Sequence, residues 1–497
     1  MIRLQEARIK VLEEQLRLNK IERFGASSEK DPAQGNFFNE VELLGDEADA
    51  AAEEEAAKAA KDAAQDKLPK KKPNKRKPLN PNIPRVQERA LLSDEQREGA
   101  IDTFFVTLKE ELDITPAKVQ VIEHLQEKAI YLDENGQRKV VVATRPAHPL
   151  GKSILSLSLL AFIIISKYCD GLPLYRLEGI LKRYGGSITR STMASALIRL
   201  SVQLQPVVNL LHEVQLTADY LQGDETRLQV LKEHGMDPRG HKWIWVARGG
   251  PPDKPVVLFH YNKSREGSIA NELLDGFEGR YYQCDGYSGQ IAAVDSQNVT
   301  VIGCMDHARR KFVKAEKALP KNSKRDQPAK CTIARSMIDG LYRVECEMNK
   351  LDLSDDQRKA YRLEHAKPKL DKLHQWLVIN STKVAKDTLS YKAIKYSLNQ
   401  WNRLIAYCDH GQIHISNVLA ENAIRPFVVG RKAWLFADTP RAATASANSY
   451  TIIESAKANG IEPLKYILHL CRHIAKAETV DDIEALLPWN VKDQLTR

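Results

Sequence analysis

Cysteine is scarce and unevenly placed in this chain of 497 residues. Its seven cysteines are dispersed, none of them forms a CxxC pair, and none precedes Cys169. Residues 90–147 therefore cannot form a cysteine-based zinc module, because His124 and His148 alone would be a poor ligand set, and we expect no zinc. A dispersed and odd number of cysteines is typical of reduced thiols, which indicates a cytoplasmic protein.

Long apolar runs are also missing. The best candidate, ILSLSLLAFIIIS at residues 154–166, is shorter than the roughly 18 to 20 apolar residues that span a bilayer. We interpret it as a buried helix and expect no membrane association. The charged N-terminus lacks the apolar core of a signal peptide. No glycine-rich phosphate loop is present, so ATP use is not indicated.

The sequence does contain a concentrated block of positive charge. The formal net charge is +9, from 74 Lys and Arg against 65 Asp and Glu. Residues 45–89 form a low-complexity linker that is first acidic and then Pro-broken and basic, as in KLPKKKPNKRKPLNPNIPR. A basic arm of this kind cannot fold alone but can neutralise nucleic-acid phosphates; the alternative is a solubilising linker. The residues of the arm that we expect to contact DNA are Lys71, Lys72, Lys75, Arg76 and Lys77.

Two segments that flank this linker have their own patterns. Residues 1–44 begin with a charged amphipathic helix, which either forms a coiled-coil seam for self-association or packs on its own domain. Residues 90–148 alternate in short runs around Asn135-Gly136, which predicts a small β-rich module.

Residues 149–212 are helical and contain a Gly-Gly break before a second helix capped by Thr189 or Ser191. Arg190 stands at the start of that second helix. A helix, a short turn and a second helix fit the helix-turn-helix of DNA-binding proteins, although ordinary helical hairpins have the same pattern.

The remaining chain predicts an α/β core that is interrupted once. Residues 213–324 read as three strands, a helix, two further strands and a helix, which is an α/β order. Residues 325–410 are polar, helical and poor in strands, and we interpret them as an insertion. Residues 411–440 form a core helix that carries Glu421, and residues 441–497 form a helical C-terminal region.

Three acids stand out by their positions. Asp224 follows the apolar run of the first strand, Asp285 follows the fourth strand, and Glu421 lies on the helix after the insertion. Carboxylates brought together raise each other's pKa, and a divalent cation removes that conflict. Mg²⁺ binds a few carboxylates together with substrate phosphates, and two such ions support in-line phosphoryl transfer. The alternative is that three of the 65 acids lie at strand or helix ends without a common role.

Basic residues follow the fifth strand and Glu421. They suit the phosphates of a DNA backbone, which suggests that metal and phosphate occupy one cleft. The candidates are His307, Arg309, Arg310 and Lys311 after the fifth strand, and Arg425, Arg431 and Lys432 after Glu421. His307 is either a phosphate ligand or a structural hydrogen-bonding residue.

Several motifs occur in an order that resembles transposases of the insertion-sequence-66 family: GDETRLQVL, HKWIWVAR, YYQCDGYSG, GCMDHARRKF, AENAIRPFVVGRKAWLF and SYTIIESAKANGIEPLKYI. The resemblance implies a ribonuclease H-like core with a DDE triad of Asp224, Asp285 and Glu421 that binds two Mg²⁺ ions, for which Mn²⁺ would substitute. It also implies cleavage and strand transfer of DNA at the terminal inverted repeats of a mobile element. Self-association and small accessory proteins of the element are expected with it, as is a location at the nucleoid.

The chain departs from the family pattern around the triad. Ala433 stands where Asn is usual, Ser416-Asn417 replaces an Asp-Asn pair, Gln290 replaces an aromatic residue and Met305 replaces a Trp. These differences keep two alternatives open: a transposase-derived DNA-binding protein that is catalytically impaired, and a metal-dependent DNA nuclease without joining activity.

Overall fold

The computed structural model describes the N-terminal helix and most of the chain after residue 117. The described residues are 2–24, 105, 118–132, 137–286, 294, 299–320 and 328–496. The chain divides into two compact units, residues 1–35 with 120–497 and residues 36–119, and almost all described residues belong to the first. The predicted basic arm, with Lys71, Lys72, Lys75, Arg76 and Lys77, lies outside the described residues, as does Gln290.

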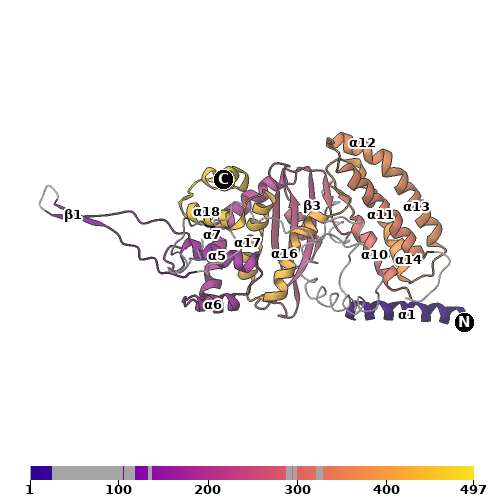
Figure 1. The fold of residues 1–497 in the computed structure, drawn as a ribbon, viewed down its shortest axis with the longest axis horizontal. Coiled ribbons are helices and arrows are strands. Elements are labelled where there is room, and N and C mark those ends of the chain that lie inside the picture. The colour runs from indigo at the N-terminus through magenta and orange to yellow at the C-terminus, as the bar shows by residue number, and fades with distance from the viewer. Residues whose placement is uncertain are drawn as a thin grey trace, which may run out of the picture. The chain divides into compact units, whose positions relative to one another are not determined.

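A mixed six-stranded sheet forms the centre of the first unit (Figure 1). Its order is β5-β4-β3-β6-β7, and β8 pairs with β3 outside this path. β4 pairs antiparallel with both β3 and β5, whereas β6 and β8 pair in parallel with β3 and β7 pairs in parallel with β6. The predicted α/β class is therefore confirmed. The strands are β3 (Tyr220–Val230), β4 (His241–Gly249), β5 (Val256–Asn262), β6 (Tyr281–Gln283), β7 (Thr300–Ile302) and β8 (Phe436–Ala437), of which β8 was not predicted.

β3 has two different neighbours along one edge. β6 pairs with residues 220–222 and β8 with residues 229–230, while β4 covers the other edge. Residues 223–228 have no described strand partner on the β6 side. Asp224 falls in this interval, inside a strand of 11 residues and not at its end as expected. The gap leaves room for a polar side chain and a helix to meet β3 at its centre.

The outer edge of β5 is covered by a helix. Thr451 Oγ1 accepts a hydrogen bond from the backbone N–H of Phe259 at 2.8 Å, and Ser455 Oγ accepts one from Val257 at 3.0 Å. Both hydroxyls come from α17 (Pro440–Ala458). Because an edge strand presents unpaired N–H groups, these side chains satisfy donors that would otherwise be left to pair with another chain.

α6 (Leu174–Arg183) and α7 (Arg190–Leu216) form the predicted helix, turn and helix. Thr189 caps α7 by accepting a hydrogen bond from the N–H of Thr192 at 3.3 Å. α7 runs for 27 residues and buries its later turns, and Gln215 donates to the carbonyl of Ala247 on the sheet at 2.9 Å. The helix is thus a structural core element, and Arg190 at its start is exposed.

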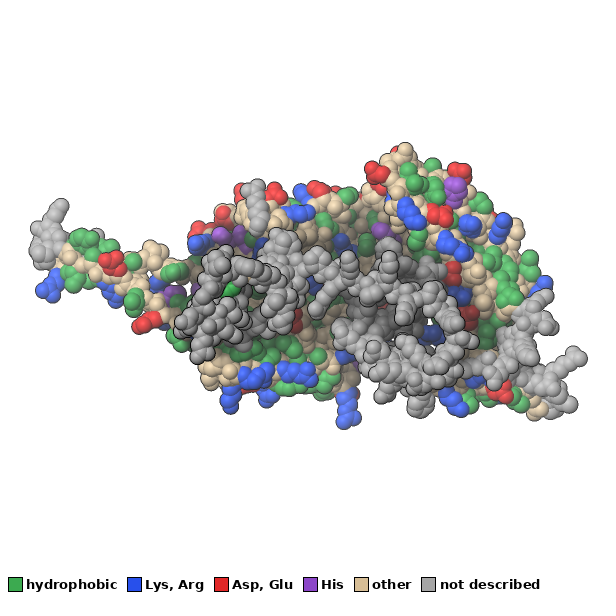
Figure 2. Space-filling view, in the orientation of Figure 1, with side chains coloured by type: hydrophobic (Ala, Val, Ile, Leu, Met, Phe, Trp, Pro, Cys, Tyr) green, Lys and Arg blue, Asp and Glu red, His purple; other side chains and the backbone are tan. Residues whose placement is uncertain are grey.

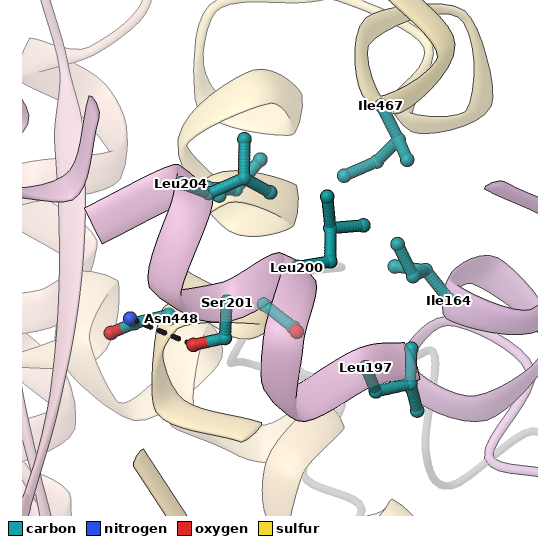
Figure 3. A pocket seen from close by; sticks show the side chains of 9 residues that line it. Ile164, Leu197, Leu200, Ser201, Leu204, Asn448 and Ile467 are labelled. Carbon is teal, nitrogen blue, oxygen red and sulfur yellow. Dashed lines mark hydrogen bonds between the residues drawn. The ribbon is translucent and has the colours of Figure 1, made fainter. Parts of the chain in front are cut away.

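α5 (Leu157–Tyr168) is the predicted buried helix of the most apolar run, and it packs with α7, α17 and α18 (Pro463–His473). A small cavity lies among these helices (Figure 3). Its polar lining includes Asn448 and Ser201, which hydrogen-bond to each other at 3.0 Å. The cavity is otherwise largely apolar, and we regard it as a packing defect.

A two-stranded hairpin and the N-terminal helix complete the segments before the core. β1 (Lys128–Leu132) and β2 (Arg138–Val142) pair antiparallel around the predicted Asn-Gly turn, whose residues lie outside the described ones. α1 (Ile2–Phe24) contacts its own unit, because Arg17 Nε donates to the carbonyl of Ala318 at 2.9 Å and Glu14 accepts from the N–H of Leu389 at 3.0 Å.

The described residues of the predicted insertion are helical and pack on α10 (Met305–Lys317) (Figure 1). Its core joins apolar residues of α10 to those of the insertion, for example Phe312, Leu341 and Ile394. The insertion consists of α11 (Lys330–Met348), α12 (Asp355–His365), α13 (Lys367–Ser381), α14 (Leu389–Asn399), α15 (Trp401–Ile405) and a 3₁₀ helix (Ala406–Asp409).

The other described helices are α8 (Gly267–Leu273), α16 (Val418–Trp434), α19 (Val480–Glu484), α20 (Pro488–Leu495) and a 3₁₀ helix (Ile474–Lys476). Within the part of the chain that the structure describes, no helix has the length and apolar character needed to cross a membrane.

Candidate active site

Asp224 on β3 and Asp285, two residues beyond the end of β6, have matching offsets on neighbouring segments. β3 pairs in parallel with β6 through Tyr220↔Tyr281 and Gln222↔Gln283, an offset of 61 residues. Asp224 and Asp285 have the same offset, and each comes two residues after the last pair. Side chains two residues apart on a strand share a face, and parallel neighbours are roughly 5 Å apart. The register therefore brings the two aspartates together.

A glutamine fixes α16 beside this pair. Gln222 Oε1 accepts a hydrogen bond from the N–H of Ala420 at 3.1 Å, and its Nε2 donates to the carbonyl of Ser416 at 3.2 Å. Asn417 Nδ2 also donates to the carbonyl of Gly223 at 3.3 Å. These bonds attach the start of α16 to β3 next to Asp224. Glu421 lies in the first turn of α16, where the helix dipole favours a carboxylate.

The electrostatics of Asp224 are those of a buried acid among other acids. Burial raises the pKa of Asp224 well above its ordinary value, and the negative charges of Glu421, Glu225 and Asp285 raise it further. Only the hydrogen bond from the N–H of Glu225, at 2.9 Å, acts against this rise. Four carboxylates therefore share one low-dielectric neighbourhood, and Glu225 was not among the predicted residues.

Glu421 has a cationic partner from α10. Arg310 forms an ion pair and hydrogen bond with its Oε1, and His307 Nδ1 lies 3.6 Å from the same oxygen. Burial raises the pKa of Glu421, and the charge of Asp306 adds to the rise, while Arg310 and Arg425 oppose it. Arg310 of α10 thus pairs with Glu421 directly, and Arg425 lies on α16 beyond Glu421.

His307 is neutral at physiological pH. Burial lowers the pKa of its imidazole to about 4, and the nearby charges of Arg310 and Lys311 lower it further. A neutral ring has no net charge with which to attract a phosphate. Its Nδ1 is buried and has no hydrogen-bond partner among the described residues.

Arg309 is a correction to the predicted DNA-binding set. Its side chain is only 6% exposed and donates from Nε to Asp339 Oδ1 of α11 at 2.6 Å. Neighbours on a helix point in different directions, so Arg309 faces the insertion while Arg310 faces Glu421. Arg309 fastens α11 to α10 and does not reach solvent.

The other basic residues that we predicted differ in their exposure and in their contacts. Lys311 is exposed and lies with its Nζ 4.3 Å from the centre of the Tyr396 ring, while Tyr396 donates to the carbonyl of Asp285 at 2.9 Å. Arg431 donates to Thr226 Oγ1 at 3.2 Å and to a carbonyl of β3, so part of its donor capacity is used within the protein. Lys432 is exposed and Arg425 is half-buried.

The residues that differ from the family pattern around the triad are partly buried in the core and partly exposed. Asn417 and Ser416 are buried and tie α16 to β3, and Met305 is buried in the core of the insertion. Ala433 is exposed. Asn417 and Ser416 thus support the position of Glu421, while Ala433 adds no contact that we can assign.

Gly223, next to Asp224, is required by a close approach. A Cβ added there would lie 1.7 Å from the hydroxyl oxygen of Tyr282 on β6. We expect Gly223→Ala to lower the free energy of unfolding by about 1–3 kcal/mol, because Tyr282 is buried and must shift. Urea unfolding measures the change. Gly179→Ala is the matched control, since a Cβ on this helical glycine meets nothing within 4 Å and is expected to stabilise slightly. Equal stability of Gly223→Ala and wild type would contradict the close approach.

Three family models match the chain. The model described as the transposase IS66 family covers residues 152–445, the IS66 C-terminal element covers residues 451–489, and a model described as transposase C of IS166 homeodomain covers residues 11–87.

Similar chains come from Sinorhizobium fredii (strain NBRC 101917 / NGR234). An uncharacterized protein, y4qI, is 29% identical over 440 residues, which is 85% of this chain and 79% of that protein. A second, y4hP, is 27% identical over 395 residues, or 77% and 70% of the two chains. Because the first family model covers more than half of its length, including all three acids of the site, the chain belongs to the IS66 family of transposases.

Proposed function

We propose that this chain is a DDE-type transposase that cleaves DNA at the ends of an insertion sequence and transfers the strands to a target. The observation that carries the proposal is the meeting of Asp224, Asp285 and Glu421 from β3, the end of β6 and the first turn of α16. The strand order of the central sheet also supports the proposal. Three antiparallel strands (β5, β4 and β3) are followed by two parallel ones (β6 and β7), which is the order expected of a ribonuclease H-like core.

The donor set fits magnesium. Asp224, Asp285 and Glu421 offer carboxylate oxygens in one buried region. Burial raises the pKa of Asp224, and the charges of Glu421 and Asp285 raise it further, which is the situation a hard divalent cation relieves. Two Mg²⁺ ions, or Mn²⁺ in their place, would supply activation of a water or a 3′-hydroxyl and stabilisation of the leaving oxygen. Asp224 and Asp285 would hold them from the sheet, and Glu421 from α16.

The protein's own residues orient the DNA in this proposal. Lys311 and Lys432 are exposed cations on α10 and α16, the two helices that carry Arg310 and Glu421. Arg310 can exchange its bond to Glu421 for one to a phosphate of the DNA backbone. Arg425 and Arg431 lie on α16 beyond Glu421. Tyr396 of the insertion fixes the backbone at Asp285, so the insertion supports the site directly.

A second basic surface covers α6. Figure 2 shows Lys and Arg side chains gathered over this helix at the lower edge of the view. Exposed aromatic rings stand among them, which suits stacking on bases or sugars together with phosphate binding. The exposed residues are Tyr175, Arg176, Lys182, Arg183 and Tyr184 of α6 and its end, with Arg190 at the start of α7. We infer that this surface, together with the basic arm, binds DNA.

The test of the function is metal-dependent nicking of a labelled element end by the purified full chain. Strand breaks in Mn²⁺ or Mg²⁺ but not in EDTA, followed by joined products with a target duplex, are expected. Breaks without joined products would instead support a nuclease, and DNA binding without breaks would support a catalytically impaired DNA-binding protein. Paired inverted repeats in the DNA flanking the reading frame would define the end substrate.

Self-association through α1 is part of the proposal. Ile9, Leu12 and Leu16 are 56%, 56% and 57% exposed and follow an a-d-a spacing of three and four residues, as in a coiled coil. Leu12→Glu with Leu16→Glu is expected to shift the sedimentation of the full chain toward monomer, because charge is then placed in the seam. Gln15→Glu, at an exposed polar position, is the control. Unchanged sedimentation of the double variant would leave α1 as a helix that packs only on its own unit.

A further inference from the structure

The start of α10 presents two soft ligands to Glu421. Cys304 is the N-cap of α10, and His307 follows one helical turn later. The Cys304 Sγ, a ring nitrogen of His307 and a carboxylate oxygen of Glu421 all lie within 4.8 Å of one another. Neither Cys304 nor His307 belongs to the proposed DDE triad.

The spacing of these atoms approaches that of a zinc site. With Zn–N and Zn–O distances near 2.1 Å and Zn–S near 2.3 Å, tetrahedral geometry puts ligand atoms about 3.4–3.6 Å apart. His307 Nδ1 and Glu421 Oε1 are already 3.6 Å apart. The Cys304 sulfur lies within 4.8 Å of the other two ligand atoms, so it must approach them by no more than about 1.2 Å. Three protein ligands would leave a fourth position for water or a substrate oxygen.

The ligand atoms are also free for a metal. His307 Nδ1 is buried and has no hydrogen-bond partner among the described residues. Cys304 is fully buried, and burial keeps the pKa of its thiol well above the ordinary value. Backbone N–H groups of Asn417 and His307 point at this sulfur and favour the thiolate. Arg310 is the competitor, because it bonds the same carboxylate oxygen.

We propose that Cys304, His307 and Glu421 bind one thiophilic divalent cation, with zinc as the preferred ion, at a site separate from Asp224 and Asp285. On binding, the Cys304 thiol gives its proton to solvent, Arg310 leaves Glu421, and the thiolate and carboxylate together balance the two positive charges. This site differs from the expectation of no zinc. That expectation was based on residues 90–147, which contain no cysteine. In its consequence it rests on the proposed function: a zinc ion on Glu421 withdraws that carboxylate from the triad and inhibits strand cleavage.

Cobalt(II) titration of the full chain tests the site without any activity assay. After removal of metals with a chelator, one equivalent of Co²⁺ is expected to give a thiolate-to-cobalt charge-transfer band in the near ultraviolet and intense visible bands of tetrahedral cobalt. One equivalent of Zn²⁺ should remove both. X-ray absorption of the zinc form should show one sulfur at about 2.3 Å and nitrogen or oxygen ligands at about 2.0–2.1 Å.

Matched variants make the assignment specific. Cys304→Ser should lose the charge-transfer band, and His307→Ala should lose the tetrahedral intensity. Cys284→Ser should keep both, since Cys284 is an equally buried thiol that is not part of the cluster, and Asp224→Asn should keep both as well. No charge-transfer band in the wild type, or a band that persists in folded Cys304→Ser, overturns the proposal. If Cys304→Ser does not fold, His307→Ala decides, because retained tetrahedral intensity in that variant also overturns it.

The regulatory consequence is measured separately. Stoichiometric Zn²⁺ is expected to reduce Mn²⁺-dependent nicking by the wild type at least tenfold. If the protein gives the full cobalt spectrum but its nicking activity does not respond to zinc, the proposed inhibition is wrong. The proposed metal site is still supported in that case. A protein that shows the cobalt spectrum yet never nicks DNA contradicts the proposed function and leaves the site standing.

Discussion

Asp224→Asn, Asp285→Asn and Glu421→Gln are each expected to reduce strand cleavage below detection, by at least about 10³-fold, while DNA binding is retained. The reason is that each substitution removes a carboxylate ligand from a set that acts as a unit. Nicking of a labelled end substrate gives the activity, and fluorescence anisotropy with the same DNA gives the binding. Asp253→Asn, an exposed acid in the β4–β5 turn, is the control and should act like the wild type.

Asp224→Asn is expected to have the opposite effect on stability. Because the folded pKa of Asp224 is raised, its contribution to stability is fully present below the unfolded pKa, near 3.8, and is lost as pH rises through the folded pKa. In EDTA the wild type should therefore lose more stability than Asp224→Asn between about pH 4 and pH 8. Mg²⁺ or Mn²⁺ should restore the wild-type melting temperature and leave Asp224→Asn unchanged. A variant that still cleaves DNA, or a wild type whose stability does not respond to either metal, would remove that residue from the proposed site.

Arg362→Met is expected to lower the free energy of unfolding by about 3–5 kcal/mol, the largest stability effect that we predict for one side chain. Arg362 is 1% exposed and forms a bidentate pair with Glu345 at 2.9 and 2.8 Å. It also donates to the carbonyls of Tyr407 at 3.0 Å and His410 at 2.8 Å. Its loss leaves a carboxylate and two carbonyls without their partner in the interior of the insertion.

Chemical unfolding compares this variant with two others. Lys367→Met removes the exposed pair of Lys367 with Asp371 and should cost less than about 0.5 kcal/mol. Glu345→Gln combined with Arg362→Met should recover part of the loss, since the buried charge is then absent. If Arg362→Met alone lowers the free energy of unfolding by less than about 1 kcal/mol, the Glu345 carboxylate must be hydrated or hydrogen-bonded to another donor in that variant. Because Tyr396 of the insertion holds the backbone at Asp285, cleavage should also fall in Arg362→Met.

Predictions from periodicity succeeded where the pattern is local. The strands β3, β4 and β5, the helix α8, the fifth strand leading into α10 and the helical insertion lie where alternation and helical spacing indicated them. The aspartates were chosen because they follow apolar runs. For Asp285 this position is correct, but Asp224 lies inside β3, since β3 continues past it against β4 and later β8.

Predictions about charged side chains were less reliable, for a physical reason. Arg309, Arg310 and Lys311 are consecutive in the sequence, yet one is buried against Asp339, one pairs with Glu421 and one is exposed over Tyr396. The helix turns by about 100° per residue, so each cation meets a different neighbour. The sequence predicts this rotation along α10, but it does not show which side of the helix faces the insertion.

The sequence by itself determined the family and the α/β class and singled out the three acids of the proposed site, because these depend on residue types and on the local period of apolar positions. Only the tertiary structure decided how the acids meet. The parallel register of β3 and β6 aligns Asp224 with Asp285, and Gln222 attaches the start of α16 to β3, across nearly 200 residues of chain. The tertiary structure also brought Cys304 and His307 to Glu421 and paired Arg310 with it. Such contacts join residues with no shared local period, so hydrogen bonds and burial between distant segments decide them.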